Sequence, residues 1–176
     1  MSIAGLLQAE MDIEVQATRT LLERLPPGNW NWKPHEKSMN LSRLATHVAE
    51  IASWSGAMLK ADELDFLSPE MQDWTPRELQ SVEEILAVLD EAAAKCRDDL
   101  ATTSDEAFQA DWTMRAGDQV LMTEPRYMVF RRQVLNHLVH HRGQLEVYFR
   151  MLGAPLPMIY GPTADDDGGM GGPGVE

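Results

Sequence analysis

The chain has 176 residues, of which 44% are apolar and 24% charged, and a formal net charge of −13 at pH 7. These values predict one soluble globular domain with a hydrophobic core. The negative charge repels nucleic-acid phosphates and anionic membrane surfaces, so we expect neither as a partner. Cys96 is the single cysteine, and the first residues lack the basic start and apolar run of a signal peptide, which together favour the cytoplasm.

Apolar residues recur at three- and four-residue steps in four stretches, which predicts four long helices. These helices span residues 3–25, 40–61, 78–102 and 124–152. The stretch 62–77 contains two prolines and is predicted to be a connection, with at most a short turn of helix. Partial alternation around Gly117 predicts a short hairpin or paired extended segment between the third and fourth helices. We therefore expect an all-α fold, a four-helix bundle interrupted only by this segment.

The domain is predicted to cover residues 1–165. The remaining residues, 166–176, read DDGGMGGPGVE and contain almost no apolar side chains. Because such a composition cannot contribute to a core, we predict a disordered C-terminal tail.

Histidines are concentrated in the fourth predicted helix, which carries three of the five. His137 and His141 are four residues apart, so their rings project from the same helix face, as two ligands of one metal ion require. His140 lies about 60° round the helix from His137 and is predicted to flank this pair. His47 lies in the middle of the apolar face of the second predicted helix. If the second and fourth predicted helices are neighbours, His47, His137 and His141 converge on one point.

Three protein ligands with an open fourth position are typical of catalytic zinc sites, and nickel, iron or copper would also accept them. The alternative for His47 is a buried histidine that forms a hydrogen bond with a neighbour. The pair on the fourth helix favours the metal site, because burying three unpaired imidazoles would be costly. A zincin places its general base directly after the first histidine of the pair, and here that residue is Leu138, so protease chemistry is not expected.

Gln144 lies one turn beyond His141 on the same face. It is predicted to support a ligand ring or a metal-bound water, and an ordinary amide at the core edge is the alternative. His140 and His35 are predicted to be surface or loop histidines, although His35 could line the mouth of a pocket.

Cys96 continues the apolar stripe of the third predicted helix. It is therefore predicted to be a small core residue and not a nucleophile. Gly143 lies inside the fourth helix, where glycine costs about 1 kcal/mol relative to alanine. This suggests that another backbone packs closely there, and simple tolerance of glycine is the alternative.

Three separated phrases resemble the DinB family. They are KSMNLSRLATHVAEI at 37–51, LNHLVHHRGQLEVYFRMLG at 135–153 and PMIYGPTADD at 157–166. The resemblance implies a four-helix bundle, a homodimer, and a divalent metal ion held by three histidines. Those histidines correspond to His47, His137 and His141, the same residues that the spacing selects. The resemblance is compatible with zinc or nickel as the ion.

The family resemblance also implies possible activities. Characterised members of the superfamily include a maleylpyruvate isomerase that uses mycothiol and transferases that use bacillithiol, in which the metal is thought to favour the thiolate of the cofactor. The family name refers to induction by damage, which suggests a stress response but not DNA contact. Two hypotheses remain. One is a metal-dependent enzyme, either a transferase for a low-molecular-weight thiol or a hydrolase. The other is a non-catalytic metal-binding or structural dimer.

Overall fold

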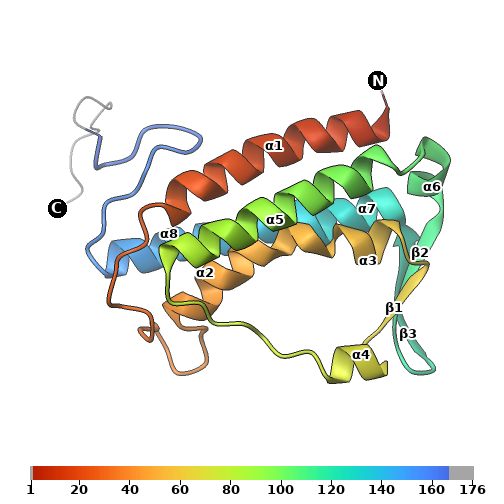
Figure 1. Cartoon of the computed structure of the whole chain (residues 1–176), viewed down its shortest axis with the longest axis horizontal. Helices are drawn as coiled ribbons and strands as arrows, with labels where there is room; N and C mark the ends of the chain where they lie inside the picture. The colour runs from red at the N-terminus through yellow and green to blue at the C-terminus, as the bar shows by residue number, and fades with distance from the viewer. Residues whose placement is uncertain (1, 167–176) are drawn as a thin grey trace.

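The computed structural model of the protein describes residues 2–166, and its long helices lie side by side with a small sheet at one end (Figure 1). The main helices are α1 (Ile3–Leu22), α2 (Leu41–Glu50), α3 (Ser55–Leu59), α5 (Val82–Ala101), α7 (Arg126–Phe130) and α8 (His137–Met151). α1, α2 and α3 all contact α5, and α8 contacts both α1 and α2. The contact between α2 and α8 brings His47 close to His137 and His141. The predicted tail, apart from Asp166, lies outside the described residues.

Side-chain caps define where three of these helices begin. The side chains of Ser2, Asn40 and Ser81 each accept a hydrogen bond from the backbone N–H three residues further on. Such a cap satisfies one of the helix's unpaired donors and contributes about 1 kcal/mol. The apolar stripes then face a common core, in which the aromatic residues Trp112, Phe130 and Phe149 are fully buried.

Two of the predicted helices are not uniform. The second changes to a 3-10 turn, η1 (Ile51–Trp54), before continuing as α3. The fourth contains a π-helical segment, η2 (Arg131–Asn136), between α7 and α8. π-Helical turns are rare and occur frequently at functional sites, and this one ends directly before His137.

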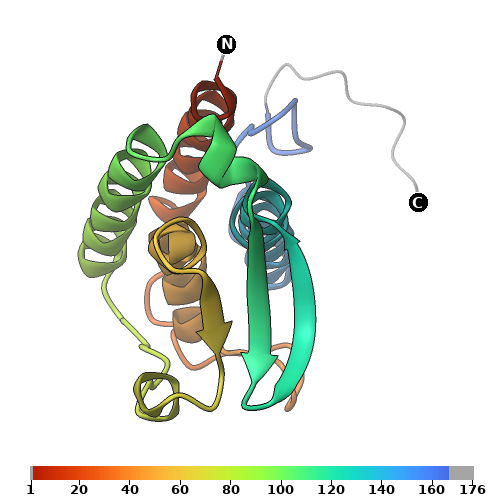
Figure 2. The ribbon, with the colours of Figure 1, turned by 90° about the vertical axis from the view of Figure 1, so that its right-hand side faces the viewer.

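The sheet contains three strands in the order β1-β2-β3 (Figure 2). The strands are β1 (Glu63–Asp65), β2 (Asp111–Ala116) and β3 (Gln119–Pro125), and the short helices α4 (Pro69–Gln72) and α6 (Asp105–Gln109) flank them in the chain. β1 pairs parallel with β2, whereas β2 pairs antiparallel with β3. The indole of Trp112 donates a hydrogen bond of 2.9 Å to the carbonyl of Ala57, which attaches the sheet to α3.

The prediction of an all-α bundle is wrong, because the described chain combines its helices with this mixed sheet. The predicted hairpin corresponds to β2 and β3. The stretch 62–77 was predicted as a connection with at most a short turn of helix. It contains that turn as α4 but also supplies β1, which was not predicted. A three-residue strand is too short to show alternation, and its parallel partner lies far away in the sequence, so no local pattern indicated it. No helix within residues 2–166 is long and apolar enough to span a lipid bilayer.

Candidate metal site

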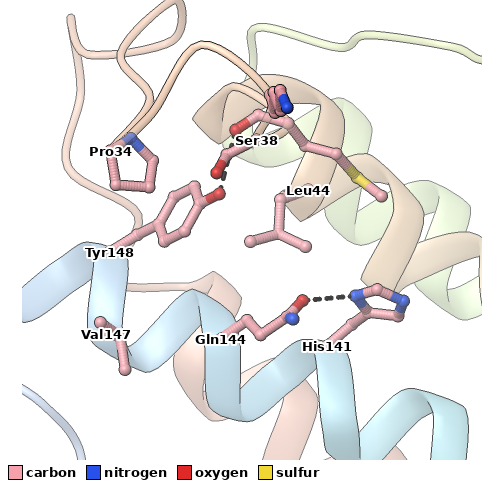
Figure 3. Close-up of a pocket in the computed structure, with 9 residues that line it drawn as sticks. Pro34, Ser38, Leu44, His141, Gln144, Val147 and Tyr148 are labelled. Atoms are coloured by element: carbon pink, nitrogen blue, oxygen red, sulfur yellow. Dashed lines mark hydrogen bonds between the residues drawn. The ribbon is translucent and has the colours of Figure 1, made fainter.

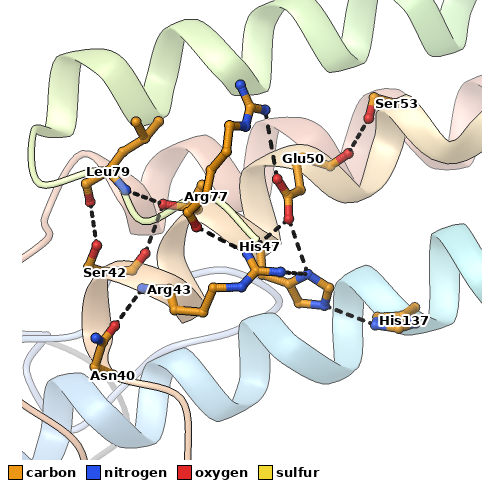
Figure 4. Close-up of polar contacts among 10 residues, drawn as sticks. Asn40, Ser42, Arg43, His47, Glu50, Ser53, Arg77, Leu79 and His137 are labelled. Carbon is orange, nitrogen blue, oxygen red and sulfur yellow. Dashed lines mark hydrogen bonds and ion pairs between the residues drawn. The ribbon is translucent and has the colours of Figure 1, made fainter. Parts of the chain in front are cut away.

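The three histidines selected from the sequence lie together where α2 meets α8. One ring nitrogen from each of His47, His137 and His141 lies within 4.8 Å of the other two. The Nε2 atoms of His47 and His137 are 3.1 Å apart (Figure 4). The ring centroids of His47 and His137 lie 4.6 Å and 4.5 Å, respectively, from that of His141. Packing of α2 on α8 therefore brings together residues that are 90 positions apart in the chain.

The donor set fits a divalent metal ion. At the usual metal–nitrogen distance of about 2.0–2.1 Å, tetrahedral ligands lie about 3.3 Å from one another. The Nε2 atoms of His47 and His137 already match that separation. The third nitrogen, within 4.8 Å, needs only a small movement to complete the set.

Burial and neighbouring imidazoles lower the pKa values of His137 and His141. Burial, followed by repulsion from His47 and His140, lowers the pKa of His137 to about 4. Burial is also the largest cause that lowers the pKa of His141 to about 4, although the hydrogen bond with Gln144 acts in the opposite direction. Because imidazole binds a metal only when it is neutral, both rings are in the ligand form at pH 7.

These low pKa values predict how the stability of the metal-free protein depends on pH. Between pH 6.5 and about 4 the unfolded state binds more protons at His137 and His141 than the folded state does. Lowering the pH through this window therefore favours unfolding, and the loss begins before carboxylates titrate. We expect the thermal midpoint of the metal-free protein to fall between pH 6.5 and 5, as measured by circular dichroism.

The matched variant is the double substitution His137→Phe and His141→Phe, which keeps an aromatic ring at both positions. Its thermal midpoint should depend less on pH in that range. An equal pH dependence in the two proteins would show that other groups cause the loss of stability.

His47 is held by charged partners behind its ring (Figure 4). Its Nδ1 lies 3.3 Å from Nη2 of Arg43 and 3.5 Å from Oε1 of Glu50. Glu50 is only 6% exposed, and it accepts a 2.9 Å hydrogen bond from Arg43. Burial raises the pKa of Glu50, but hydrogen bonds with His47 and Arg43 outweigh burial and lower it overall. A second arginine, Arg77, lies 3.7 Å from the other carboxylate oxygen.

These partners suit both tautomers of His47. Without a cation, Nε2–H of His47 can donate to His137 while Nδ1 accepts from Arg43. When the Nε2 lone pair faces a cation instead, Nδ1 carries the proton and Glu50 is the acceptor within reach. A carboxylate that accepts from the distal nitrogen of a ligand histidine orients the ring and raises its basicity. With a metal ion bound, Glu50 would thus act as a positioning residue for His47.

We expect Glu50→Gln to weaken metal binding about 10-fold and Glu50→Ala to weaken it up to about 100-fold. Glutamine retains an acceptor but loses the charge that favours the Nδ1–H tautomer. Competition with a chromophoric chelator measures both affinities.

The control is Glu91→Gln, which neutralises an exposed carboxylate on α5. It should bind metal like the unmodified protein. If the Glu50 variants bind equally well while remaining folded, Glu50 does not position His47.

Gln144 lies where the sequence placed it, next to His141. Its Oε1 is 2.7 Å from Nδ1 of His141, which leaves Nε2 of that ring as the free donor atom. The amide nitrogen of Gln144 lies 3.1 Å from Nε2 of His140. His140 is exposed and does not join the cluster, and His35 is an exposed loop residue whose Nδ1 accepts from the backbone of Lys37.

Trp54 borders the cluster on another side. Its ring centroid lies 5.3 Å from that of His47 and 5.1 Å from that of His137. Glu50 and Trp54 were not among the residues predicted for the site. Their spacing of three and seven residues from His47 could have indicated them in the sequence, because it places all three residues on one helix face.

A pocket of about 430 Å³ adjoins the cluster at His141 (Figure 3). It lies between α8 and the loop that precedes α2. Its lining consists of Pro34, Lys37, Ser38, Met39, Leu44, His141, Gln144, Val147 and Tyr148. The lining is largely apolar and includes no carboxylate. The pocket therefore offers a small molecule access to the His141 side of the cluster.

Two other residues singled out from the sequence are not part of the site. Cys96 is buried, and burial raises the pKa of its thiol to about 12, so it is not a thiolate at neutral pH. A Cβ added at Gly143 would meet no atom within 4 Å. The close backbone approach predicted there is not found within the described chain.

Comparison with known proteins identifies the same family that the sequence phrases resemble. The model of the DinB family matches residues 4–168. A solved DinB-like protein from Bacillus subtilis is 18% identical, with a TM-score of 0.65 over 88% of this chain and 97% of its own. A DinB-like protein from Bacillus cereus ATCC 10987 is 21% identical, with a TM-score of 0.64 over 90% and 98% of the two chains. A proposed DinB member from Exiguobacterium sibiricum 255-15 is also 21% identical, with a TM-score of 0.65 over 90% and 97%. No curated protein matches the chain.

Proposed function

The chain belongs to the DinB family, and we propose that it binds a divalent metal ion through His47, His137 and His141. The observation that carries this proposal is the convergence of their ring nitrogens within 4.8 Å. The low pKa values of His137 and His141 support it, since both rings are neutral at physiological pH. Zinc and nickel suit a donor set made only of imidazoles.

We further propose that the site is catalytic and acts on a low-molecular-weight thiol, as an S-transferase does. A bound zinc or nickel ion would supply a Lewis acid that lowers the pKa of a thiol reaching it. The chain's own residues would hold and orient the imidazoles, while Trp54 limits access from one side. The pocket beside His141 gives a small molecule access.

The pocket lining favours a thiol substrate over hydrolysis. Activation of water commonly uses a side-chain base, and no aspartate or glutamate lines the pocket. Glu50 lies behind His47, with both of its carboxylate oxygens near arginines. A thiol needs no such base, because a coordinating thiol is deprotonated by the metal itself.

In the first step of the test, the protein is purified without a histidine tag and its bound metal is measured. The protein is then loaded with cobalt and titrated with a small thiol. We expect one ion per chain and a sulfur-to-metal charge-transfer band that is absent from His141→Ala. A protein that binds no metal would overturn the metal site. A metal-loaded protein that is indifferent to every thiol would overturn the thiol chemistry. Indifference to every thiol, water and small anion would leave a closed, non-catalytic site.

The homodimer, the cytoplasmic location and the link to a stress response stay predictions. For the dimer, α8 exposes an apolar stripe of Val139, Val147 and Met151, with Gly143 between them. A second copy related by two-fold symmetry would cover this stripe. Light scattering at tens of micromolar should then give twice the chain mass.

A further inference from the structure

We propose that the pocket beside the histidine cluster selects thiols that carry a negatively charged group, and that Lys37 recognises this group. This inference rests on the proposed function, because it assumes that the sulfur of the ligand reaches the metal. It adds the chemical class of the substrate. Two observations support it: the charge of the lining, and the hydrogen bond by which Tyr148 holds the loop segment that contains Lys37.

Lys37 is the one lysine whose ammonium has no hydrogen-bond or ion-pair partner in the part of the chain that the structure describes. Lys33 donates to a backbone carbonyl, Lys60 to the carbonyl of Asp99 and to two threonines, and Lys95 to the Asp99 carboxylate. Lys37 nevertheless lines the pocket. Its charge is therefore available to a ligand.

No opposite charge within the lining competes for that ligand. Lys37 is the only lysine or arginine in the lining, which contains no aspartate or glutamate. The nearby guanidinium of Arg43 is already paired with Glu50. Although the whole chain carries a net charge of −13, Lys37 is the one lining side chain that attracts an anion. A metal ion bound at the histidines would add an attraction that substitutions of Lys37 leave unchanged.

The pocket has the length needed to separate a thiol from an acidic group. His141, Gln144 and Tyr148 lie on successive turns of α8, and the seven residue steps from His141 to Tyr148 span about 10 Å at about 1.5 Å per step. At the far end, the hydroxyl of Tyr148 donates a 3.0 Å hydrogen bond to the carbonyl of Met39. This bond holds the loop segment that contains Lys37 over the Tyr148 end of the pocket.

The middle of the pocket is suited to a carbon chain. Figure 3 shows Leu44 and Gln144 facing the space between Tyr148 and His141, with Pro34 and Val147 at the Tyr148 end. A fitting ligand would place its sulfur near His141, an apolar or amide-containing chain beside Leu44, and its anionic group near Lys37.

Three probes of equal length test the charge preference directly. They are 6-mercaptohexanoate, 6-mercapto-1-hexanol and 6-amino-1-hexanethiol, which differ only in the charge of the group opposite the thiol. Each is titrated into cobalt-loaded protein at low ionic strength, and the charge-transfer band gives its dissociation constant. We expect the anionic thiol to bind about two- to fivefold more tightly than the neutral one, the range of one exposed ion pair, with the cationic thiol weakest. The differences should shrink in high salt.

Charge reversal identifies the residue responsible. Lys37→Glu should invert the order, so that the cationic thiol binds most tightly. Lys33→Glu makes the same change of charge four residues away, at a position that does not line the pocket, and should keep the original order. Circular dichroism confirms that both variants are folded.

The possible failures are distinguishable. Equal binding of all three thiols, or an anionic preference that persists in Lys37→Glu, would overturn this inference and leave the proposed function intact. Absence of a charge-transfer band with every thiol would overturn the proposed thiol chemistry, and this inference with it.

Discussion

Replacing any one of His47, His137 and His141 with alanine is expected to abolish stoichiometric metal binding at micromolar protein. Structural zinc sites with four ligands are stabilised by about 10–16 kcal/mol, so one ligand contributes about 3–4 kcal/mol. Losing one imidazole should thus weaken binding between a hundred- and a thousandfold. The remaining two histidines cannot compensate, because no other histidine, cysteine or carboxylate in the described chain belongs to the cluster. Bound metal is measured by mass spectrometry after gel filtration.

His140→Ala and His35→Ala are the matched controls. His140 is exposed and its ring lies beside that of His141, with centroids 4.9 Å apart, but it is not one of the three clustered histidines. His35 lies in the loop before α2. Both variants should retain one metal ion per chain. If His140→Ala loses the metal as completely as His137→Ala does, the ligand set has been assigned wrongly.

Replacing Arg142 with alanine should destabilise the fold by about 2–4 kcal/mol. Arg142 is 1% exposed and forms an ion pair of 2.7 Å with Glu14 on α1. It also donates to the backbone carbonyl of Glu14, to Thr18 and to the hydroxyl of Tyr160. Breaking a buried pair typically costs 3–5 kcal/mol, and the Glu14 side chain, at 16% exposure, can recover part of its hydration. Urea denaturation followed by circular dichroism measures this loss.

Two further substitutions separate the contributions of charge and packing. Tyr160→Phe removes only the hydroxyl that bonds Arg142 and Glu14, and should cost about 1 kcal/mol. Arg142→Met keeps most of the side-chain volume but removes the cationic partner of Glu14, which retains only its hydrogen bond from Tyr160. The loss of stability should therefore lie between those of Tyr160→Phe and Arg142→Ala. An Arg142→Ala protein as stable as the original would show that this network does not attach the C-terminal segment to the helices.

Patterns of short range within the sequence predicted much of the helical structure. The four apolar stripes correspond to four helical regions. In the structure, caps at Ser2 and Asn40 lie directly before two of them. The i, i+4 spacing placed His137 and His141 on one face. These features depend on the 3.6-residue period and on hydrogen bonds between neighbouring residues, so they can be recognised before any tertiary contact is known.

The sheet and the irregular turns could not be predicted in this way. β1 has three residues and is stabilised by pairing with β2, across a connection that contains α5. The π-helical segment before His137 and the 3-10 turn at Trp54 continue apolar stripes that look α-helical in the sequence. In both cases long-range packing selects among backbone conformations that the local pattern does not distinguish.

The sequence by itself determined which residues can be ligands, because histidine type and helical spacing are local properties. Tertiary structure decided that His47 lies opposite His137, that Glu50 is held between Arg43 and Arg77, and that the loop carrying Lys37 covers α8. Each of these arrangements joins segments distant in the chain. Their geometry depends on how whole helices pack around the common core, and no stretch of a few residues contains that information.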